Sequence, residues 1–360
     1  MHRTMFGLPR RIWLAFADSR VGSNSLSVAF TITGAPVKPI VLAVILNVAL
    51  AGGSRAATPD EKQSGSSVIA PHPAKRTQAA EKPPVTDPVL IGAGDIADCS
   101  DISGAEATAK LLEANPGTVM AVGDLAYPDG TKENFACYDK TWGRVKSRTR
   151  PAVGNHEFHS TGATFYFDYF GSAAGDSKNG FYSYDLGSWH IIVLNSECSE
   201  VGGCNAGSRE EKWLRADLAS HPAACTLAYF HKPLFSSGDK HGNDPEIQPF
   251  FQALYDAHAD VVVNGHDHDY ERFAPQSPNG SPDPKLGIRE FVAGTGGKSH
   301  RPFAASRPNS EIRDDTTFGV LKLVLGPHHY DWLFVPEAGK TFTDSGSGQC
   351  HGSAAPFNSQ

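Results

Sequence analysis

Short apolar runs alternate with amphipathic segments along the chain from position 89 onward. The apolar runs are rich in Val, Ile and Leu and have the length of buried strands; they are 89–91, 118–122, 189–194, 226–230 and 261–263. The amphipathic segments have the spacing of apolar residues expected of helices; they are 105–114, 210–218 and 247–258. We expect Glu210 and Glu211 to be exposed at the start of their helix, where acids stabilise the helix dipole.

The final third of the chain has a different pattern. Apolar runs at 291–293, 319–325 and 330–334 follow one another without amphipathic segments between them. Strands in such a series usually pair in antiparallel fashion. The whole pattern therefore predicts an α/β fold in which two packed mixed β-sheets are flanked by helices.

The chain before position 89 differs in composition. Residues 40–51 form an apolar stretch broken only by Asn47, too short to span a bilayer but typical of the core of a secretory signal. The segment that follows is rich in Pro, Ser, Ala, Lys and Gln, as flexible linkers are. We therefore expect a signal or targeting segment at 1–56, a linker at 57–88, a folded domain at 89–345 and a C-terminal tail at 346–360. The mature protein would be secreted or periplasmic, without a stable membrane span.

Composition and charge narrow the class of protein. The 360 residues are 40% apolar and carry a formal charge of −7, so a sizeable core can form and nucleic acid is not an expected partner. The 6 Cys residues include no CxxC pair, and in an oxidising compartment an even number favours disulfides. Cys198 and Cys204 flank a Gly-Gly turn and are expected to pair. The other four allow three pairings, of which we favour Cys99–Cys137 with Cys225–Cys350.

Five short blocks combine an apolar run with metal-binding side chains. They are 94–97, 123–127, 154–157, 228–231 and 265–268. Each follows or ends an apolar run, and four of them contain Gly. Because ligands of open α/β sheets bind at the carboxyl ends of the strands, we expect the blocks to converge on one site.

The donor atoms in these blocks indicate the kind of metal. Oxygen comes from Asp95, Asp124, Tyr127 and Asn155, and nitrogen comes from His231, His266 and His268. The set lacks the thiolates of a structural zinc site and has too much nitrogen for calcium. It suits a catalytic pair of Fe, Mn or Zn ions, in which one carboxylate bridges the two metals.

From about position 89 to 330 the chain resembles the purple acid phosphatase branch of the calcineurin-like metallophosphoesterases. The resemblance rests on the segments 123–127, 154–157 and 265–272. It implies a four-layer sandwich in which 89–345 is the catalytic domain. It implies Fe(III) on Asp95, Asp124, Tyr127 and His268, and a divalent Fe, Zn or Mn ion on Asp124, Asn155, His231 and His266.

One position separates this branch from most of its superfamily. Most members have Asp-x-His at the first block, with the His bound to the first metal. Here Ala97 stands at that position, and Tyr127 supplies a replacement donor. A phenolate is a hard anion that favours Fe(III), so the two differences agree with each other.

The resemblance also implies an activity. A hydroxide activated by the metals would attack the phosphorus of a small phosphorylated substrate, and His156 would protonate the leaving oxygen. We expect an exported phosphomonoesterase of the acid phosphatase type. A phosphodiesterase acting on cyclic nucleotides, glycerophosphodiesters or phospholipid headgroups is the alternative, and a non-catalytic metal-binding protein is a third reading.

The sequence leaves substrate recognition open. His159 and His241 are candidates for contacting the substrate. The loops 160–179, 198–208 and 275–288 are expected to form the rim of the pocket and to decide between monoesters and diesters.

Overall fold

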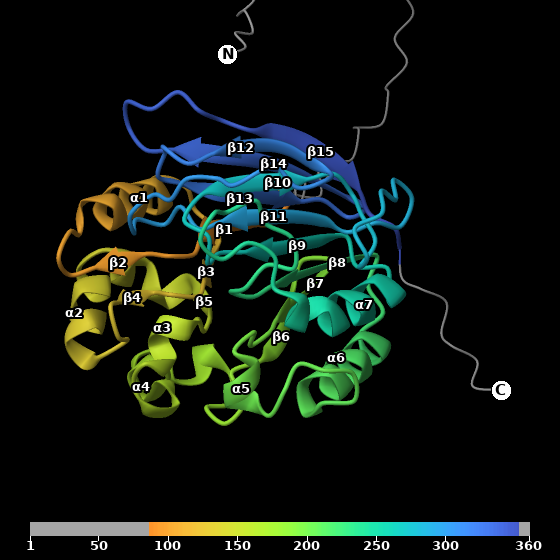
Figure 1. Ribbon diagram of the computed structural model, residues 1–360, viewed down its shortest axis with the longest axis horizontal. Coiled ribbons are helices and arrows are strands. Elements are labelled where there is room, and N and C mark those ends of the chain that lie inside the picture. Colours follow the sequence, from red (N-terminus) through yellow and green to blue (C-terminus); the bar gives the residue numbers. More distant parts are fainter. Residues whose placement is uncertain (1–85, 353–360) are drawn as a thin grey trace, which may run out of the picture. The chain divides into compact units, whose positions relative to one another are not determined.

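The computed structural model describes residues 86–352 (Figure 1). The expected signal segment, the linker up to residue 85 and the last eight residues of the expected tail lie outside the described residues. Within 86–352, no helix has the length and apolar character needed to cross a membrane.

The first sheet has six strands in the order β15-β14-β13-β1-β3-β5. Their bounds are β1 Val89–Ala93, β3 Thr118–Val122, β5 Thr149–Ala152, β13 Gly319–Leu325, β14 His329–Pro336 and β15 Ser345–Gln349. Strands β1, β3 and β5 are parallel, whereas β13, β14 and β15 pair in antiparallel fashion. The sheet therefore has a parallel half that is followed by helices and an antiparallel half built from the end of the chain.

The second sheet has seven strands in the order β12-β10-β11-β9-β8-β7-β6. Their bounds are β6 Tyr182–Leu186, β7 Trp189–Val193, β8 Cys225–Tyr229, β9 Val261–Asn264, β10 Tyr270–Phe273, β11 Arg289–Ala293 and β12 Ser310–Asp314. Strands β7, β8, β9 and β11 are parallel to one another. A short parallel pair, β2 Ala97–Asp98 and β4 Ala126–Tyr127, lies where two of the blocks meet.

The helices cover the outer faces of the two sheets. They are α1 Ser103–Ala114, α2 Lys132–Lys140, α3 Asn155–Phe158, α4 Thr164–Phe170, α5 Cys198–Val201, α6 Arg209–Ser220 and α7 Gln248–Asp256. In Figure 1, α2 to α4 gather beside β2 and β4, whereas α6 and α7 lie beside β7 and β8.

Alternating side chains build the four layers. Successive residues of a strand point to opposite faces, so Leu90 and Met120 pack between the two sheets while Ile91 packs under α1. In the second sheet, Ile191 belongs to the central core and Ile192 packs under α6 and α7. The expected α/β fold with two packed mixed sheets is confirmed.

The three disulfides expected from the sequence are present. They join Cys99 to Cys137, Cys198 to Cys204 and Cys225 to Cys350. The last bridge fastens the end of β15, so the folded part of the chain continues past position 345, where the expected domain ended.

The prediction for Glu210 and Glu211 was wrong. Both side chains are buried, with 0% and 4% of their surface exposed. Glu210 Oε1 accepts a hydrogen bond from the backbone N–H of Asn195, and Glu211 Oε2 accepts one from that of Gly207. The carboxylates satisfy backbone donors of the preceding loop, a use that the helical pattern does not reveal.

Candidate metal centre

The five blocks lie at the carboxyl ends of parallel strands. The first three follow β1, β3 and β5 of one sheet, and the last two follow β8 and β9 of the other. The ends of the two sheets meet here, since Gly94 N, after β1, donates to Ala293 O of β11 over 2.9 Å. Within the second sheet, Gly265 N donates to His231 O over 2.9 Å and joins the ends of β8 and β9. The topology thus brings together residues that are up to 173 positions apart in the sequence, from 95 to 268.

The backbone at these turns is unusual. Asp95, Asp124 and His266 have positive φ angles of 60°, 53° and 74°. Such a conformation costs a non-Gly residue on the order of 1 kcal/mol and persists only where the surroundings impose it. Gly123 has a φ of 77°, and a Cβ added there would lie 2.5 Å from the His231 ring. The turns are therefore shaped to bring functional side chains close together.

The first group of donors surrounds the phenol of Tyr127. Its hydroxyl donates to Asp95 Oδ1 over 2.7 Å and to Asp124 Oδ2 over 3.0 Å. His268 Nε2 lies 3.3 Å from the same hydroxyl and 3.4 Å from Asp95 Oδ1. His268 Nδ1 donates to Ser299 O over 2.7 Å, which directs Nε2 toward the group.

The second group shares Asp124 with the first. Asp124 Oδ2 lies 3.2 Å from His231 Nε2, and His231 Nε2 lies 3.1 Å from His266 Nδ1. His231 Nδ1 donates to Val122 O over 3.0 Å, so its Nε2 is free to act as a ligand. Asn155 Oδ1 is buried and has no hydrogen-bond partner. An unpartnered buried oxygen in a pocket that His266 also lines fits a metal ligand.

Backbone donors hold the two carboxylates in place. His266 N donates to Asp95 Oδ2 over 2.8 Å, and His156 N donates to Asp124 Oδ1 over 2.9 Å. Each contact occupies the oxygen that faces away from Tyr127. The remaining oxygens, Asp95 Oδ1 and Asp124 Oδ2, are the ones that face the other donors.

The electrostatics of the cluster favour a bound cation. Burial raises the pKa of Asp95 to about 7 despite the nearby His231. Burial and the two neighbouring carboxylates raise the pKa of Tyr127 well above 10. Placing anionic oxygens together in a buried site is costly unless positive charge compensates them. The donors present therefore fit a pair of cations, because cations supply that compensation.

Glu157 supports the site, a role that was not predicted for this residue of the third block. Its buried carboxylate accepts four backbone N–H groups at 2.8–3.2 Å, from Gly154, Asp124, Leu125 and Ala126. These bonds fasten the turn after β3 to the turn after β5. The sequence contains one signal for this role: Glu157 stands three positions after Gly154, which places its carboxylate one helical turn after the Gly.

The three further histidines occupy different places. His156 Nε2 lies 3.7 Å from Asp124 Oδ2, and its ring lies 4.2 Å from that of Tyr127. The ring of His159 lies 4.7 Å from that of His156, farther from the cluster. The ring of His241 lies 4.0 Å from that of His266. Of the two candidates for substrate contact, His241 thus contacts a donor of the cluster directly, and His159 contacts His156.

A pocket of about 360 Å³ opens beside the metal centre. Asn155 and His266 line it together with Lys232 and residues 240–244. The three loops expected to form the rim do not line this pocket in the part of the chain that the structure describes. That expectation was wrong for 275–288 in particular, because this loop leads into the amino end of β11.

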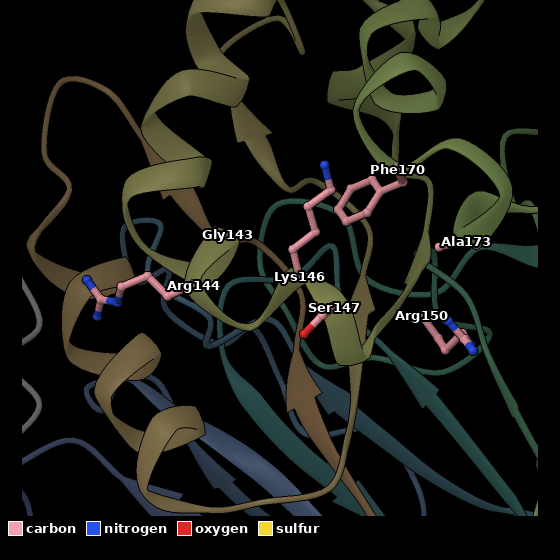
Figure 2. Close-up of a pocket in the computed structure, with 7 residues that line it drawn as sticks. All are labelled: Gly143, Arg144, Lys146, Ser147, Arg150, Phe170 and Ala173. Carbon is pink, nitrogen blue, oxygen red and sulfur yellow. The ribbon is translucent and has the colours of Figure 1, made fainter.

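A larger pocket of about 520 Å³ lies away from the cluster (Figure 2). Lys146 and Phe170 point toward one another there, and Arg144 extends away. Arg144 is paired with Glu106 at 2.7 Å and Glu113 at 2.9 Å. None of the five blocks lines this pocket, so its size does not make it the reaction site.

Known proteins resemble the chain over the same region. The family model for calcineurin-like phosphoesterases matches residues 80–270, more than half of the chain. Purple acid phosphatase 23 of Arabidopsis thaliana is 30% identical over 200 residues, which cover 45% of this chain and 43% of that protein. Purple acid phosphatase 22 of the same plant is 26% identical over 278 residues, which cover 69% of this chain and 61% of that protein. The chain thus spans about half the length of the curated relatives it matches.

A solved structure resembles the fold as well. The purple acid phosphatase PPD1 from yellow lupin seeds superimposes with a TM-score of 0.56 at 19% identity, over 72% of this chain and 53% of that chain. At this identity the likeness concerns the fold alone. The family match and the curated purple acid phosphatase relatives support one assignment. The chain belongs to the calcineurin-like phosphoesterase family, in its purple acid phosphatase-like branch.

Proposed function

We propose that the protein is an exported, binuclear metal-dependent phosphomonoesterase. Family membership implies a dinuclear metal site. The observation that supports the proposal most strongly is the position of Asp124 Oδ2, 3.0 Å from Tyr127 Oη in one group and 3.2 Å from His231 Nε2 in the other. A carboxylate shared by two donor groups is what a pair of bridged metals requires.

Two sets of residues would hold the metals. Fe(III) would bind Asp95, Asp124, Tyr127 and His268, and a divalent Fe, Zn or Mn ion would bind Asp124, Asn155, His231 and His266. Such a pair supplies Lewis acidity and lowers the pKa of a water molecule so that it is nucleophilic near neutral pH. The other tasks of the reaction fall to residues of the chain.

His156 is placed to act as the acid. Its Nδ1 donates to Pro128 O, which leaves Nε2 on the side of Asp124. The side chain is 23% exposed, so a substrate oxygen can reach it. Burial lowers the pKa of His156 below its usual 6.5, although Asp124 opposes this shift. We therefore expect the protonated acid, and its transfer of a proton to the leaving oxygen, to be favoured as the pH falls.

His241 would contact the substrate rather than the metals. Its Nε2 accepts a hydrogen bond from Arg301 Nη1 over 2.6 Å. Arg301 N in turn donates to His268 O over 3.2 Å. This chain of contacts places a cationic guanidinium next to the metal ligands, where it favours an anionic substrate.

The disulfides support the proposal of export. All six Cys residues of the chain are paired, and such bridges persist in oxidising compartments. The segment 1–56 would then be the signal, and the mature protein would be secreted or periplasmic.

The activity is tested by comparing two substrates that share a leaving group. Purified protein loaded with iron and a divalent metal is assayed for kcat/KM with p-nitrophenyl phosphate and bis(p-nitrophenyl) phosphate. We expect a clear preference for the monoester. A preference for the diester would replace the proposal with the phosphodiesterase alternative. No hydrolysis of either, with two metals bound, would favour a non-catalytic metal-binding protein.

A further inference from the structure

The pocket beside the metal centre differs in charge from the rest of the molecule. The chain as a whole carries a formal charge of −7. The pocket nevertheless has Lys232 and Lys240 in its lining, with Asp244 as the one carboxylate among the lining residues described. Asp244 Oδ1 is engaged as a helix cap, because it accepts a hydrogen bond from the Glu246 N–H over 3.0 Å. The lining is therefore locally cationic in an acidic protein.

The two lysines are in different states. Lys232 Nζ lies 2.8 Å from Glu197 Oε2, and the Lys232 side chain is 21% exposed, so its charge is already compensated. Lys240 is exposed, and no carboxylate within residues 86–352 forms an ion pair with it. Lys240 is thus the cation of the lining that remains available to a ligand.

The wall that carries Lys240 is fixed by a buried carboxylate. Asp267 Oδ2 accepts hydrogen bonds from Ser236 Oγ over 2.5 Å and from Gly242 N over 3.0 Å. Gly238 packs directly on this carboxylate, since a Cβ added there would lie 2.2 Å from Asp267 Cγ. Asp267 is itself in the turn between the metal ligands His266 and His268. The loop is therefore built onto the metal centre, and a ligand would bind it at a low cost in ordering.

The pocket and the cluster also share residues. Asn155 and His266 belong to the donor groups and line the pocket as well. A phosphoryl group bound at the cluster would therefore leave the rest of the substrate beside Lys240.

We propose that this pocket binds a second phosphate of the substrate, so that the preferred substrates are organic bisphosphates. Lys240 contacts the second phosphate, and the guanidinium of Arg301 beside His241 contributes positive charge. This inference rests on the proposed phosphomonoesterase activity and specifies its substrate class. A charge-assisted contact of this kind is expected to favour a bisphosphate over the matching monophosphate by about tenfold.

The test compares three substrates and four proteins. Fructose 6-phosphate, fructose 1,6-bisphosphate and p-nitrophenyl phosphate are assayed by release of inorganic phosphate, with equal metal loading. The proteins are the wild type, Lys240→Met, Lys240→Arg and Lys285→Met. Lys285 is an exposed control in the loop that leads to the amino end of β11, at the opposite end of the strand from the cluster.

We expect the bisphosphate-to-monophosphate ratio of kcat/KM to fall about tenfold in Lys240→Met, mainly through KM. Lys240→Arg should restore the ratio, and Lys285→Met should match the wild type. High salt should lower the wild-type ratio, because exposed charges are screened. An unchanged ratio in Lys240→Met, with p-nitrophenyl phosphate still hydrolysed, would overturn the pocket assignment and leave the proposed function standing. No hydrolysis of any substrate would overturn both.

Discussion

Two clusters of histidines and carboxylates in this molecule look alike in composition and differ in hydrogen bonding and backbone strain. Asp124, His231 and His266 meet at the metal centre, and His190, Asp217 and His221 meet between β7 and α6. In both, nitrogen and oxygen atoms that can bind a metal lie within 4.8 Å of one another. Composition alone does not separate them.

The cluster of His190 is complete without a ligand. His190 Nδ1 lies 3.0 Å from Asp185 Oδ1, and His190 Nε2 lies 2.8 Å from Asp217 Oδ2. Asp217 Oδ1 also accepts a hydrogen bond from Ser183 Oγ over 2.9 Å. Both ring nitrogens of His190 therefore have a carboxylate partner. The cluster stabilises the contact between the β6–β7 hairpin and α6.

In the metal centre, by contrast, the polar atoms do not all have hydrogen-bond partners. Asn155 Oδ1 is buried without a partner, and Asp95, Asp124 and His266 have positive φ angles. Unmet polar atoms and strained backbone both cost stability, so they persist where function requires them. These two features separate the metal centre from the cluster of His190, which the residue types do not.

The largest expected effect comes from replacing the shared carboxylate. Removing a side chain that only supports a metal ligand typically costs ~10–100-fold in activity. Asp124→Asn changes a proposed ligand of both metals, so we expect a larger loss, on the order of 10³-fold in kcat/KM. Metal content, measured by mass spectrometry, should fall with it. The matched control is Asp217→Asn. This variant should keep both metals at the metal centre and have an activity within about twofold of the wild type. Equal losses in the two variants would remove the distinction between the clusters.

The second largest effect is expected from replacing His156, the proposed general acid. His156→Ala is expected to lower kcat by ~10²-fold or more while both metals remain bound. Because burial lowers the pKa of His156, wild-type kcat should decline as pH rises through an apparent pKa below 6.5. The variant should lack that decline. A variant with full kcat and an unchanged pH profile would rule out the acid role.

A smaller effect is expected from the carboxylate that ties the turns together. Glu157→Gln replaces an acceptor of backbone N–H groups with an amide, which should cost ~1–3 kcal/mol of folding stability and weaken metal binding about tenfold. Glu210→Gln is the matched control, since Glu210 is also buried and also accepts a backbone N–H, from Asn195. The Glu210→Gln variant should lose folding stability and keep the metal affinity of the wild type. Titration calorimetry and urea unfolding measure the two quantities.

The smallest effect is a pH dependence of stability in the cluster of His190. Burial opposes protonation of His190, but its hydrogen bonds to Asp217 and Asp185 raise its pKa above 6.5, so its contribution is complete below pH 6.5 and lost as pH rises through the raised value. Despite its burial, the bonds from His190 and Ser183 lower the pKa of Asp217 below 3.8, so its contribution is lost as pH falls through the lowered value.

The expected consequence is a pH window for the substitution His190→Gln. It should destabilise the protein by about 1 kcal/mol more at pH 5.5 than at pH 9, as measured by urea unfolding. An equal effect at both values would mean that folding does not shift the pKa of His190. The metal content should not change at either pH, because this cluster holds no ligand of the metal centre.

Much of the fold could be predicted from the sequence. Strands β3 and β13 have the predicted bounds, because each is a short, mainly apolar run directly followed by Gly. Helix α2 was not predicted, since its residues lack an apolar repeat. Its start is instead defined by Thr131 and Asn134, whose side chains and backbones exchange hydrogen bonds in a capping box.

The convergence of the proposed donors could also be predicted from the sequence, and the pocket could not. The seven donors follow five strands, β1, β3, β5, β8 and β9, so strand topology brings them together. The pocket wall depends on Asp267, Gly238 and Gly242, which meet only through the tertiary fold. Such contacts leave no periodic pattern in the sequence.

The most direct test locates the metals themselves. Crystals of iron-loaded protein are measured at the iron absorption edge, and anomalous difference maps give the metal positions. We predict two peaks about 3.5–4 Å apart with the Asp124 carboxylate between them. A single peak there, or peaks only beside His190 and Asp217, would contradict the account.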